Sequence, residues 1–177
     1  MRWWEKYSAG TTLGPDEHKN MINKSSSAAF YWRHNNGDTR LGGGGWTLKR
    51  SYTCPNGNTV PAGDTCNMPP NIASIPVTDG KWHCIEIHAG LGTVGGANGV
   101  LEIWVDGTLT ARYTGLPIRG DNGKFNDVTH YAQNGAVGDR YVDDLAVGDA
   151  RIGCGATAST TSNTTTPPGA PTNLTVN

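Results

Sequence analysis

The chain of 177 residues is 36% hydrophobic, contains 25 glycines and 10 prolines, and has 14 Lys and Arg against 15 Asp and Glu, a net charge of -1. This length suffices for one ordinary domain with a core, and the glycine and proline content favours short elements joined by turns. The near-neutral charge gives no electrostatic reason to expect nucleic acid or an acidic membrane as a partner, and no apolar run approaches the roughly 20 residues of a membrane helix.

Alternating apolar and polar residues predict short strands along most of the chain, and no segment shows helical periodicity over three turns. In chain order, the expected strands cover residues 1–8, 18–24, 28–35 and 47–53, the hairpin of 81–107, and residues 109–115, 127–133 and 140–153. Residues 40–46, RLGGGGW, are too rich in glycine for a regular strand and are expected to form a loop or a heavily bulged edge. The sequence therefore predicts an all-β domain.

The composition changes near Cys154 to a Ser/Thr/Pro tract that carries too little apolar surface to fold alone. We expect a folded domain over residues 1–154 and a linker over residues 155–177. The end of the linker, PPGAPTNLTVN, resembles the opening of a fibronectin type III module. Because the first strand, RWWEKYS, begins without a lead-in, the domain is expected to be N-terminally incomplete and to belong to a longer chain with further domains.

The four cysteines, at positions 54, 66, 84 and 154, show no paired CxxC spacing that would indicate zinc. A Cys54–Cys66 bridge would close a turn-rich segment and contribute about 3 kcal/mol of loop-closure stabilisation. A Cys84–Cys154 bridge would tie the predicted hairpin to the end of the domain. The alternative is four free thiols in a cytosolic protein. If the bridges form, the protein is expected to be secreted or exposed on the cell surface.

The predicted hairpin, KWHCIEIHAGLGTVGGANGVLEIWVDG, has one apolar face and one face that mixes aromatic and ionisable residues. The apolar face carries Ile85, Ile87, Leu101, Ile103 and Val105, and the other carries Trp82, Glu86, His88, Glu102, Trp104 and Asp106. We expect a register that sets Glu86 opposite Glu102, with the carboxyl groups close to the roughly 5 to 5.5 Å separation of retaining glycosidases. The alternative is that both carboxylates pair with Lys or Arg on a solvated sheet, and a slip of one residue would break their pairing.

Four stretches carry a resemblance to a known superfamily: RWWEKYS near the start, EHKN at 17–20, the segment 79–107, and YVDDLAVGDARIG at 141–153. Together they resemble the concanavalin A-like lectin/glucanase jelly rolls, closest to secreted bacterial proteins related to polysaccharide lyases and laminin G-like domains. The resemblance implies two antiparallel sheets, one convex and one concave, with a glycan in the concave groove. The cysteine loop at 54–66 and the glycine run are no part of that pattern.

Carbohydrate binding is the function that this fold and these aromatic residues favour. Sugar rings stack on indole faces, so Trp82 and Trp104, extended by Trp32 from a neighbouring strand, are expected to form the platform. Hydroxyl groups would be oriented by polar side chains, namely Glu86, Glu102, Arg33 and Asn35. The alternative is that Trp82 and Trp104 plug the edge of the sandwich or cover the Cys84–Cys154 bridge.

Two enzymatic alternatives and one structural alternative remain open. A glycoside hydrolase is disfavoured because the E-x-D-x-x-E or E-x-D-x-E strand of the laminarinases that this fold includes is absent from the chain. A polysaccharide lyase needs a base, an acid and a group that neutralises a uronate carboxylate, for which His88, Tyr31, Arg33 and Lys19 are candidates, although alginate-lyase signatures are missing. If the protein is an enzyme, the expected catalytic residues are Glu86, His88, Glu102 and Tyr31. The third alternative is a structural or adhesive extracellular domain.

One metal site is implied by the resemblance, because glucanases of this fold often hold a structural calcium near the last strand. Adjacent Asp143 and Asp144 point to opposite faces of a strand, so at most one of them can serve a given site, and Asp144 is taken as the expected ligand without a structural reason for the choice. The alternative for these residues is a buried carboxylate that caps backbone amides. No other cofactor is expected, and four histidines without ligand spacing are expected to be structural or surface residues: His18, His34, His83 and His130.

Overall fold

A computed structural model describes residues 1–11, 19–24, 28–35, 38–48, 52–54, 57–60, 65–68, 70–119, 125–131 and 138–155. Side chains are described for residues 1–11, 53–54, 57–59, 70–119 and 138–155. Every regular element in these ranges is a β-strand, so the all-β prediction is confirmed. Among the described residues no helix is long and apolar enough to cross a membrane.

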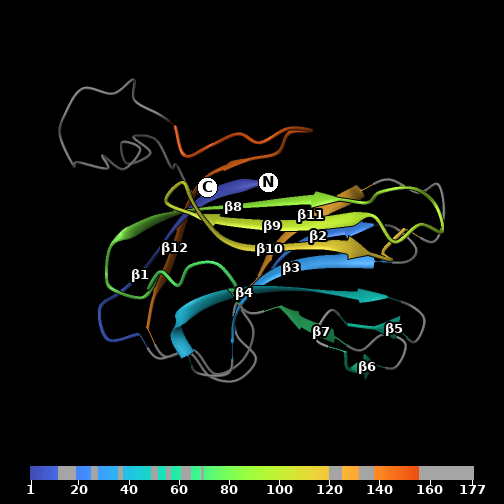
Figure 1. Ribbon diagram of the computed structural model, residues 1–177. Helices are drawn as coiled ribbons and strands as arrows, with labels where there is room; N and C mark the ends of the chain where they lie inside the picture. The colour runs from blue at the N-terminus through green and yellow to red at the C-terminus, as the bar shows by residue number, and fades with distance from the viewer. Residues whose placement is uncertain are drawn as a thin grey trace.

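The strands form two five-stranded sheets and one small two-stranded sheet, and every pairing is antiparallel (Figure 1). The first, which we call the hairpin sheet, has the order β10-β9-β8-β1-β12, and the second sheet has the order β11-β2-β3-β4-β7. The hairpin sheet contains β1 (Arg2–Tyr7), β8 (Trp82–Gly90), β9 (Gly99–Val105), β10 (Thr108–Leu116) and β12 (Arg140–Ala146). The second sheet contains β2 (Lys19–Lys24), β3 (Ala28–Asn35), β4 (Asp38–Leu48), β7 (Thr65–Met68) and β11 (Phe125–Tyr131).

The glycine run at 42–45 lies inside β4, so the prediction of a loop over residues 40–46 is wrong. The alternative of a heavily bulged edge is met in part, because the β3–β4 register shifts between Gly42 and Asp38, but β4 is not an edge strand. β4 pairs with β3 on one side and with β7 on the other, and Gly44 and Gly45 take part in both ladders. Hydrogen bonding from two neighbouring strands therefore holds an extended backbone that glycine by itself does not favour.

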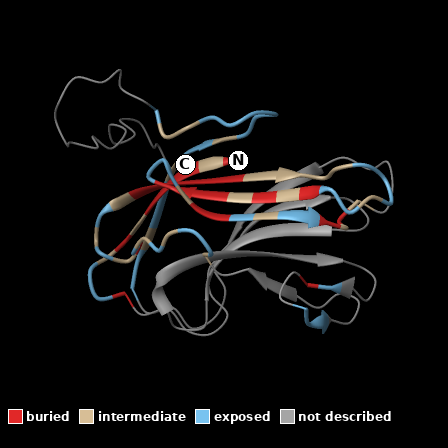
Figure 2. Ribbon diagram, in the orientation of Figure 1, coloured by how far each residue is buried: buried red, intermediate tan, exposed pale blue. Residues whose placement is uncertain are grey.

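The core lies against one face of the hairpin sheet. The apolar residues predicted to share a face are buried there without exception, and they pack with residues of β1 and β10, with Met1 and with the segments before β8 and after β10. The cluster contains Met1, Trp3, Val77, Ile85, Ile87, Leu101, Ile103, Val105, Ala111, Leu116 and Ile118. Figure 2 shows this burial concentrated along β1, β8 and β9. Each large aliphatic side chain that is fully buried contributes roughly 1.5–3 kcal/mol. We call this the core face and the opposite side of the sheet the outer face.

The β9–β10 hairpin turns on two residues, Asp106 and Gly107, both of which have positive φ (51° and 78°). This is the backbone that a two-residue turn needs to match strand twist, and Asp-Gly is a preferred sequence for it. One extra residue then bulges from β10 between Leu109 and Ala111. Beyond the bulge, the side-chain amide of Asn71 donates to the Arg112 carbonyl (2.9 Å) and its oxygen accepts from the Arg112 amide (2.9 Å).

The last strand of the hairpin sheet is shorter than predicted. β12 ends at Ala146, whereas the sequence predicted a strand over residues 140–153. A bulge opposite Arg2 and Trp4, with Asp144 at a φ of 48°, distorts β12 before its end. Residues 148–154 then cross the outer face without strand pairing, and we call this segment the strap (Figure 1).

The cysteine loop contains structure that the sequence did not predict. β6 (Thr59–Val60) pairs across the loop with β5 (Tyr52–Thr53), and Thr65–Met68 adds β7 to the second sheet. β5 is the end of the strand predicted over residues 47–53, whereas β6 and β7 were not predicted. Residues 156–177, most of the predicted linker, lie outside the described residues.

Candidate functional site

The register of the β8–β9 hairpin decides which polar side chains meet on the outer face. His88 lies opposite Glu102, and Glu86 lies opposite Trp104. The predicted register, which paired Glu86 with Glu102, is therefore wrong by two residues. A slip of two keeps every side chain on its face because the side-chain period of a strand is two, so the hydrophobic pattern cannot distinguish these registers. The two carboxylates are not direct cross-strand neighbours, which removes the argument for a retaining-glycosidase pair.

Each carboxylate oxygen of Glu102 instead contacts a different basic side chain. Its Oε2 lies 2.9 Å from His88 Nδ1, and its Oε1 accepts from Arg112 Nε at 2.6 Å. Arg112 reaches Glu102 because the β10 bulge places the two residues opposite each other. The Glu102 side chain is 13% exposed, whereas His88 and Arg112 are 43% and 52% exposed. We call His88, Glu102 and Arg112 the Glu102 cluster.

Electrostatics in the Glu102 cluster favour an ionised carboxylate. Burial by itself would raise the pKa of Glu102, but hydrogen bonds from His88 and Arg112, together with their charges, hold that pKa below its usual range. An ionised Glu102 requires a proton on His88 Nδ1, so in the neutral imidazole Nε2 is the nitrogen with the free lone pair. The cluster can therefore offer hydrogen-bond donors from Arg112 and a basic nitrogen from His88.

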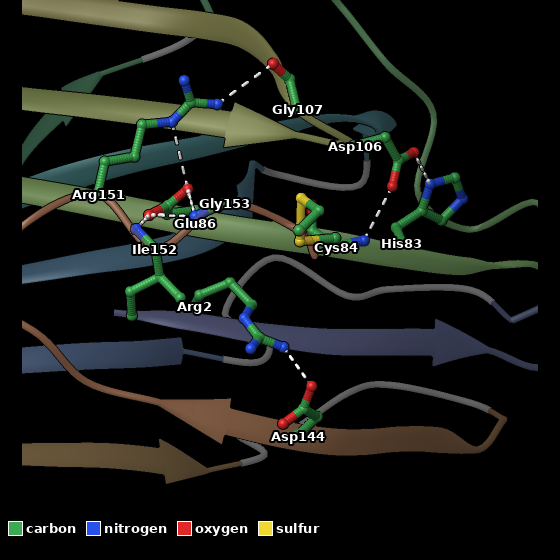
Figure 3. Close-up of a disulfide and its surroundings, with 11 residues drawn as sticks. Arg2, His83, Cys84, Glu86, Asp106, Gly107, Asp144, Arg151, Ile152 and Gly153 are labelled. Atoms are coloured by element: carbon green, nitrogen blue, oxygen red, sulfur yellow. Dashed lines mark hydrogen bonds and ion pairs between the residues drawn. A yellow bond between two sulfur atoms is a disulfide. The ribbon is translucent and has the colours of Figure 1, made fainter. Parts of the chain in front are cut away.

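The other half of the outer face lies beneath the strap. Glu86 is 1% exposed, and its Oε1 accepts from the Ile152 amide at 2.5 Å while its Oε2 accepts from the Gly153 amide at 3.1 Å (Figure 3). Arg151 Nε lies 3.4 Å from Glu86 Oε2, and the Arg151 guanidinium lies 4.6 Å from the ring centroid of Trp104. Trp104 is only 7% exposed. Its indole therefore does not present an open platform. The alternative, that Trp104 plugs the edge of the sandwich or covers the Cys84–Cys154 bridge, stays a prediction.

A disulfide fixes the strap to the sheet, and the predicted Cys84–Cys154 bridge is confirmed. It joins residues 70 apart in sequence with a Cα–Cα distance of 5.7 Å, well within the usual range. Cys54 is also disulfide-bonded. The side chain of its predicted partner, Cys66, lies outside the described residues.

A second polar arrangement, at the start of β8, was not predicted as a unit. His83 is buried between two carboxylates, with Nδ1 2.7 Å from Asp106 Oδ2 and Nε2 2.8 Å from Asp79 Oδ1. The other Asp106 oxygen accepts from the Cys84 amide at 2.9 Å (Figure 3). We call His83, Asp79 and Asp106 the His83 clamp. Since it joins the segment before β8 to the β9–β10 turn, His83 is structural, as the sequence suggested.

The charges of the His83 clamp reinforce one another. Burial by itself would lower the pKa of His83, but hydrogen bonds and charge from Asp106 and Asp79 outweigh burial and raise it above 6.5. For Asp79, burial would raise the pKa, but hydrogen bonds from His83 and Lys81 and the charge of His83 lower it to about 2. The two carboxylates therefore favour the imidazolium form of His83 more than solvent does for a free imidazole.

The remaining predicted site residues are spread over both sheets. Trp82 is half-buried on the outer face, opposite Lys6 of β1. Trp32 belongs to β3 of the second sheet, so the prediction that it extends the platform from a strand neighbouring the hairpin is wrong. Tyr31, Arg33 and Asn35 lie on the same strand, and Lys19 lies on β2; their side chains are outside the described residues, as are those of His34 and His130 and the whole of His18.

Asp144 lies at the edge of the hairpin sheet, where its exposed carboxylate forms an ion pair with Arg2 (Figure 3). The described side chains contain no group of three or more metal-ligating residues. Calcium binding by Asp144 stays a prediction. The alternative of a buried capping carboxylate is wrong for Asp144, because its side chain is exposed.

Sequence reasoning missed the two arginines that complete the outer face. Arg112 could have been placed on that face by alternation along β10, but its partner depends on the bulge. No sequence pattern predicted the position of Arg151, because Arg151 lies in the strap, which has no regular secondary structure. Comparisons of the chain with protein-family models, with curated proteins and with solved structures find no match in any of the three.

Proposed function

We propose that the protein binds a polysaccharide along the outer face of the hairpin sheet, at the Glu102 cluster. The observation that supports this most directly is that Glu102 holds His88 and Arg112 in place while both remain about half exposed. Side chains that are already oriented lose little entropy when a ligand binds, which favours recognition of hydroxyl groups with fixed geometry. The carboxylate in the cluster, and a net charge of -1, disfavour a polyphosphate ligand.

The proposal includes the arrangement of the two five-stranded sheets. The complete burial of the apolar core face is what a covering second sheet would produce, as in a jelly-roll sandwich of the concanavalin A-like kind. In that arrangement the outer face of the hairpin sheet would be the glycan-binding side. The Cys84–Cys154 bridge supports a secreted or cell-surface location, because disulfides persist mainly in oxidising compartments.

A panel of neutral and uronate polysaccharides tests binding by affinity electrophoresis. We expect retention on at least one of them, and Arg112→Ala should weaken it by about tenfold or more, since a hydrogen bond to a charged group is worth about 1.5–3 kcal/mol. Lys81→Ala is the matched control, because it removes the same charge from a side chain that is 78% exposed and outside the cluster. Retention that is equal in both variants, or absent from every polysaccharide, would contradict the proposal and favour a structural or adhesive domain.

A polysaccharide lyase is the second candidate, and the geometry of His88 is what favours it. With Nδ1 held by Glu102, His88 Nε2 would take the C5 proton of a uronate while the C4–O bond breaks, a C4=C5 double bond forms, and solvent water protonates the departing C4 oxygen. Arg112 would pair with the uronate carboxylate. Incubation with uronate polymers would then produce the ultraviolet absorbance of an unsaturated uronate, and His88→Gln would abolish it. Binding without such absorbance would identify a non-catalytic module.

A further inference from the structure

The strap covers the part of the outer face that best suits a sugar ring. Trp104 and Glu86 are almost fully buried, yet the strap residues above them are exposed: the Arg151 side chain by 48% and Ile152 by 37%. The cover is therefore a single layer of chain. Trp104 also adjoins His88, with ring centroids 6.4 Å apart, so the covered area is continuous with the Glu102 cluster.

Several polar contacts hold the strap against the sheet. Glu86 accepts from the amides of Ile152 and Gly153, and Arg151 contacts Glu86, Trp104 and, at 3.4 Å, the Gly107 carbonyl. The hydrophobic core of the described residues contains no residue of the strap. The Cys84–Cys154 bond joins the end of the strap covalently to β8.

We propose that the Cys84–Cys154 bridge latches the strap over a cryptic sugar-binding subsite, which opens when the bridge is reduced. This inference rests on the proposed function, and it adds a redox-controlled subsite to it. In the open form the Trp104 indole stacks on a pyranose ring, and the Glu86 carboxylate accepts from sugar hydroxyls in place of the two strap amides. The Glu102 cluster then binds the neighbouring residue of the same polysaccharide.

The opening step is a thiol–disulfide exchange with a dithiol reductant. A thiolate of the reductant attacks the sulfur of Cys154, a residue that is partly exposed, whereas Cys84 is fully buried. The S–S bond breaks, and the second thiol of the reductant resolves the mixed disulfide. Two electrons and two protons pass to the protein, Cys84 and Cys154 become thiols, and the reductant becomes a disulfide.

Hydrogen exchange and glycan affinity, measured together, test the proposal. The Cys84→Ala/Cys154→Ser variant removes only this bridge, and it is compared with the oxidised wild type. We expect exchange at the amides of Ile152 and Gly153 to accelerate by about tenfold or more, while the Ile87 amide in the centre of the sheet stays protected. Affinity for the polysaccharide retained by the wild type should rise by about tenfold or more, as for a site that is open in under a tenth of oxidised molecules.

Two further arms isolate the cause of any change. Adding dithiothreitol to the double variant reduces only the remaining bridge, and it should have no further effect on affinity. Trp104→Phe in the double variant should abolish most of the gain while leaving the strap amides in fast exchange. If the double variant fails to fold, with the Ile87 amide exchanging freely, wild type treated with dithiothreitol supplies the open form.

The outcomes separate this inference from the function on which it rests. Unchanged protection of the strap amides overturns the latch. Fast exchange with unchanged affinity overturns the cryptic subsite but leaves binding at the Glu102 cluster intact. Fast exchange with no binding to any polysaccharide in either form overturns the proposed function and the subsite together. Fast exchange with increased affinity that depends on Trp104 supports the proposal.

Discussion

The His83 clamp gives the stability of the protein a defined dependence on pH. We consider Asp79→Asn, which leaves a side chain of the same shape but removes the charge that faces His83. In the folded protein the pKa of Asp79 is lowered from 3.8 to about 2. A group whose pKa is lowered by folding stabilises the folded state above its unfolded pKa, and that contribution is lost as pH falls through the folded pKa. The contribution of Asp79 should therefore disappear between about pH 4 and about pH 2.

The magnitude follows from the pKa and from the exposure of the carboxylate. A pKa lowered from 3.8 to about 2 corresponds to roughly 2.4 kcal/mol of free energy of unfolding. The Asp79 side chain is 31% exposed, so solvent screens the interaction and we expect about 1–2 kcal/mol. Chemical unfolding of wild type and Asp79→Asn at several pH values gives the difference directly. Wild type should be more stable by that amount at about pH 5, and most of the difference should be lost by about pH 2.

A second carboxylate, outside the His83 clamp, serves as a control for the general effect of acid on the free energy of unfolding. Asp149 is exposed on the strap, so Asp149→Asn should show a difference from wild type of less than about 0.5 kcal/mol at any pH. The raised pKa of His83 predicts a loss of stability on the alkaline side as well. The contribution of His83 to the free energy of unfolding is complete below pH 6.5 and is lost as pH rises through the pKa of His83 in the folded protein. A difference between wild type and Asp79→Asn that is the same at pH 5 and pH 2 would refute the reasoning.

Three substitutions test the packing of the hairpin sheet by chemical unfolding. Gly99→Ala should destabilise by about 1–3 kcal/mol, because the new Cβ would lie 2.5 Å from a side-chain carbon of Ile118 and 2.8 Å from the Leu116 carbonyl oxygen. Full stability would show that both the Ile118 side chain and the backbone at Leu116 can move. Gly107→Ala should lower the free energy of unfolding by about 1 kcal/mol or more, because alanine is strained at a φ of 78°. No atom lies close to the new Cβ, so the strain is in the backbone alone, and an unchanged free energy of unfolding would show that alanine tolerates this φ. Arg140→Met should cost about 3–5 kcal/mol by leaving the buried Glu5 carboxylate without this cation, and adding Glu5→Gln should restore part of the loss; no recovery would point to lost packing instead.

The faces of the strands were predictable from sequence, whereas their pairing was not. Alternation alone assigned Ile85, Ile87 and Ile103 to the core, because burial selects apolar residues at every second position. The same periodicity is satisfied by any register that differs by two, so it could not place Glu86 opposite Trp104. Nothing in the composition of the loop at residues 91–98 fixes which of these registers forms.

The Glu102 cluster shows how one bulge limits prediction of a site. The Asp-Gly turn indicates a two-residue hairpin, and counting outward from it would place Ala111 opposite Glu102. The extra residue in β10 moves Arg112 into that position instead. Thr110, within the bulge, is held by long-range contacts: its carbonyl accepts from the amides of Ile72 and Ala73. Such contacts are set by tertiary structure and leave no periodic trace in the sequence.

The carboxylates on the outer face already have partners within the protein, and this limits their affinity for a sugar. Glu102 already binds His88 and Arg112, and Glu86 already binds the strap, so a ligand must compete with internal partners rather than fill an empty acceptor. Each exchange of one hydrogen bond for another yields only a small net free energy. A single sugar residue should therefore bind weakly. Higher affinity should come from several sugar residues of one polysaccharide that bind at once, because each bound residue raises the effective concentration of the next one. Affinity should thus rise steeply with oligosaccharide length, and equal affinity for a monosaccharide and a long oligosaccharide would indicate a closed pocket instead of a sheet face.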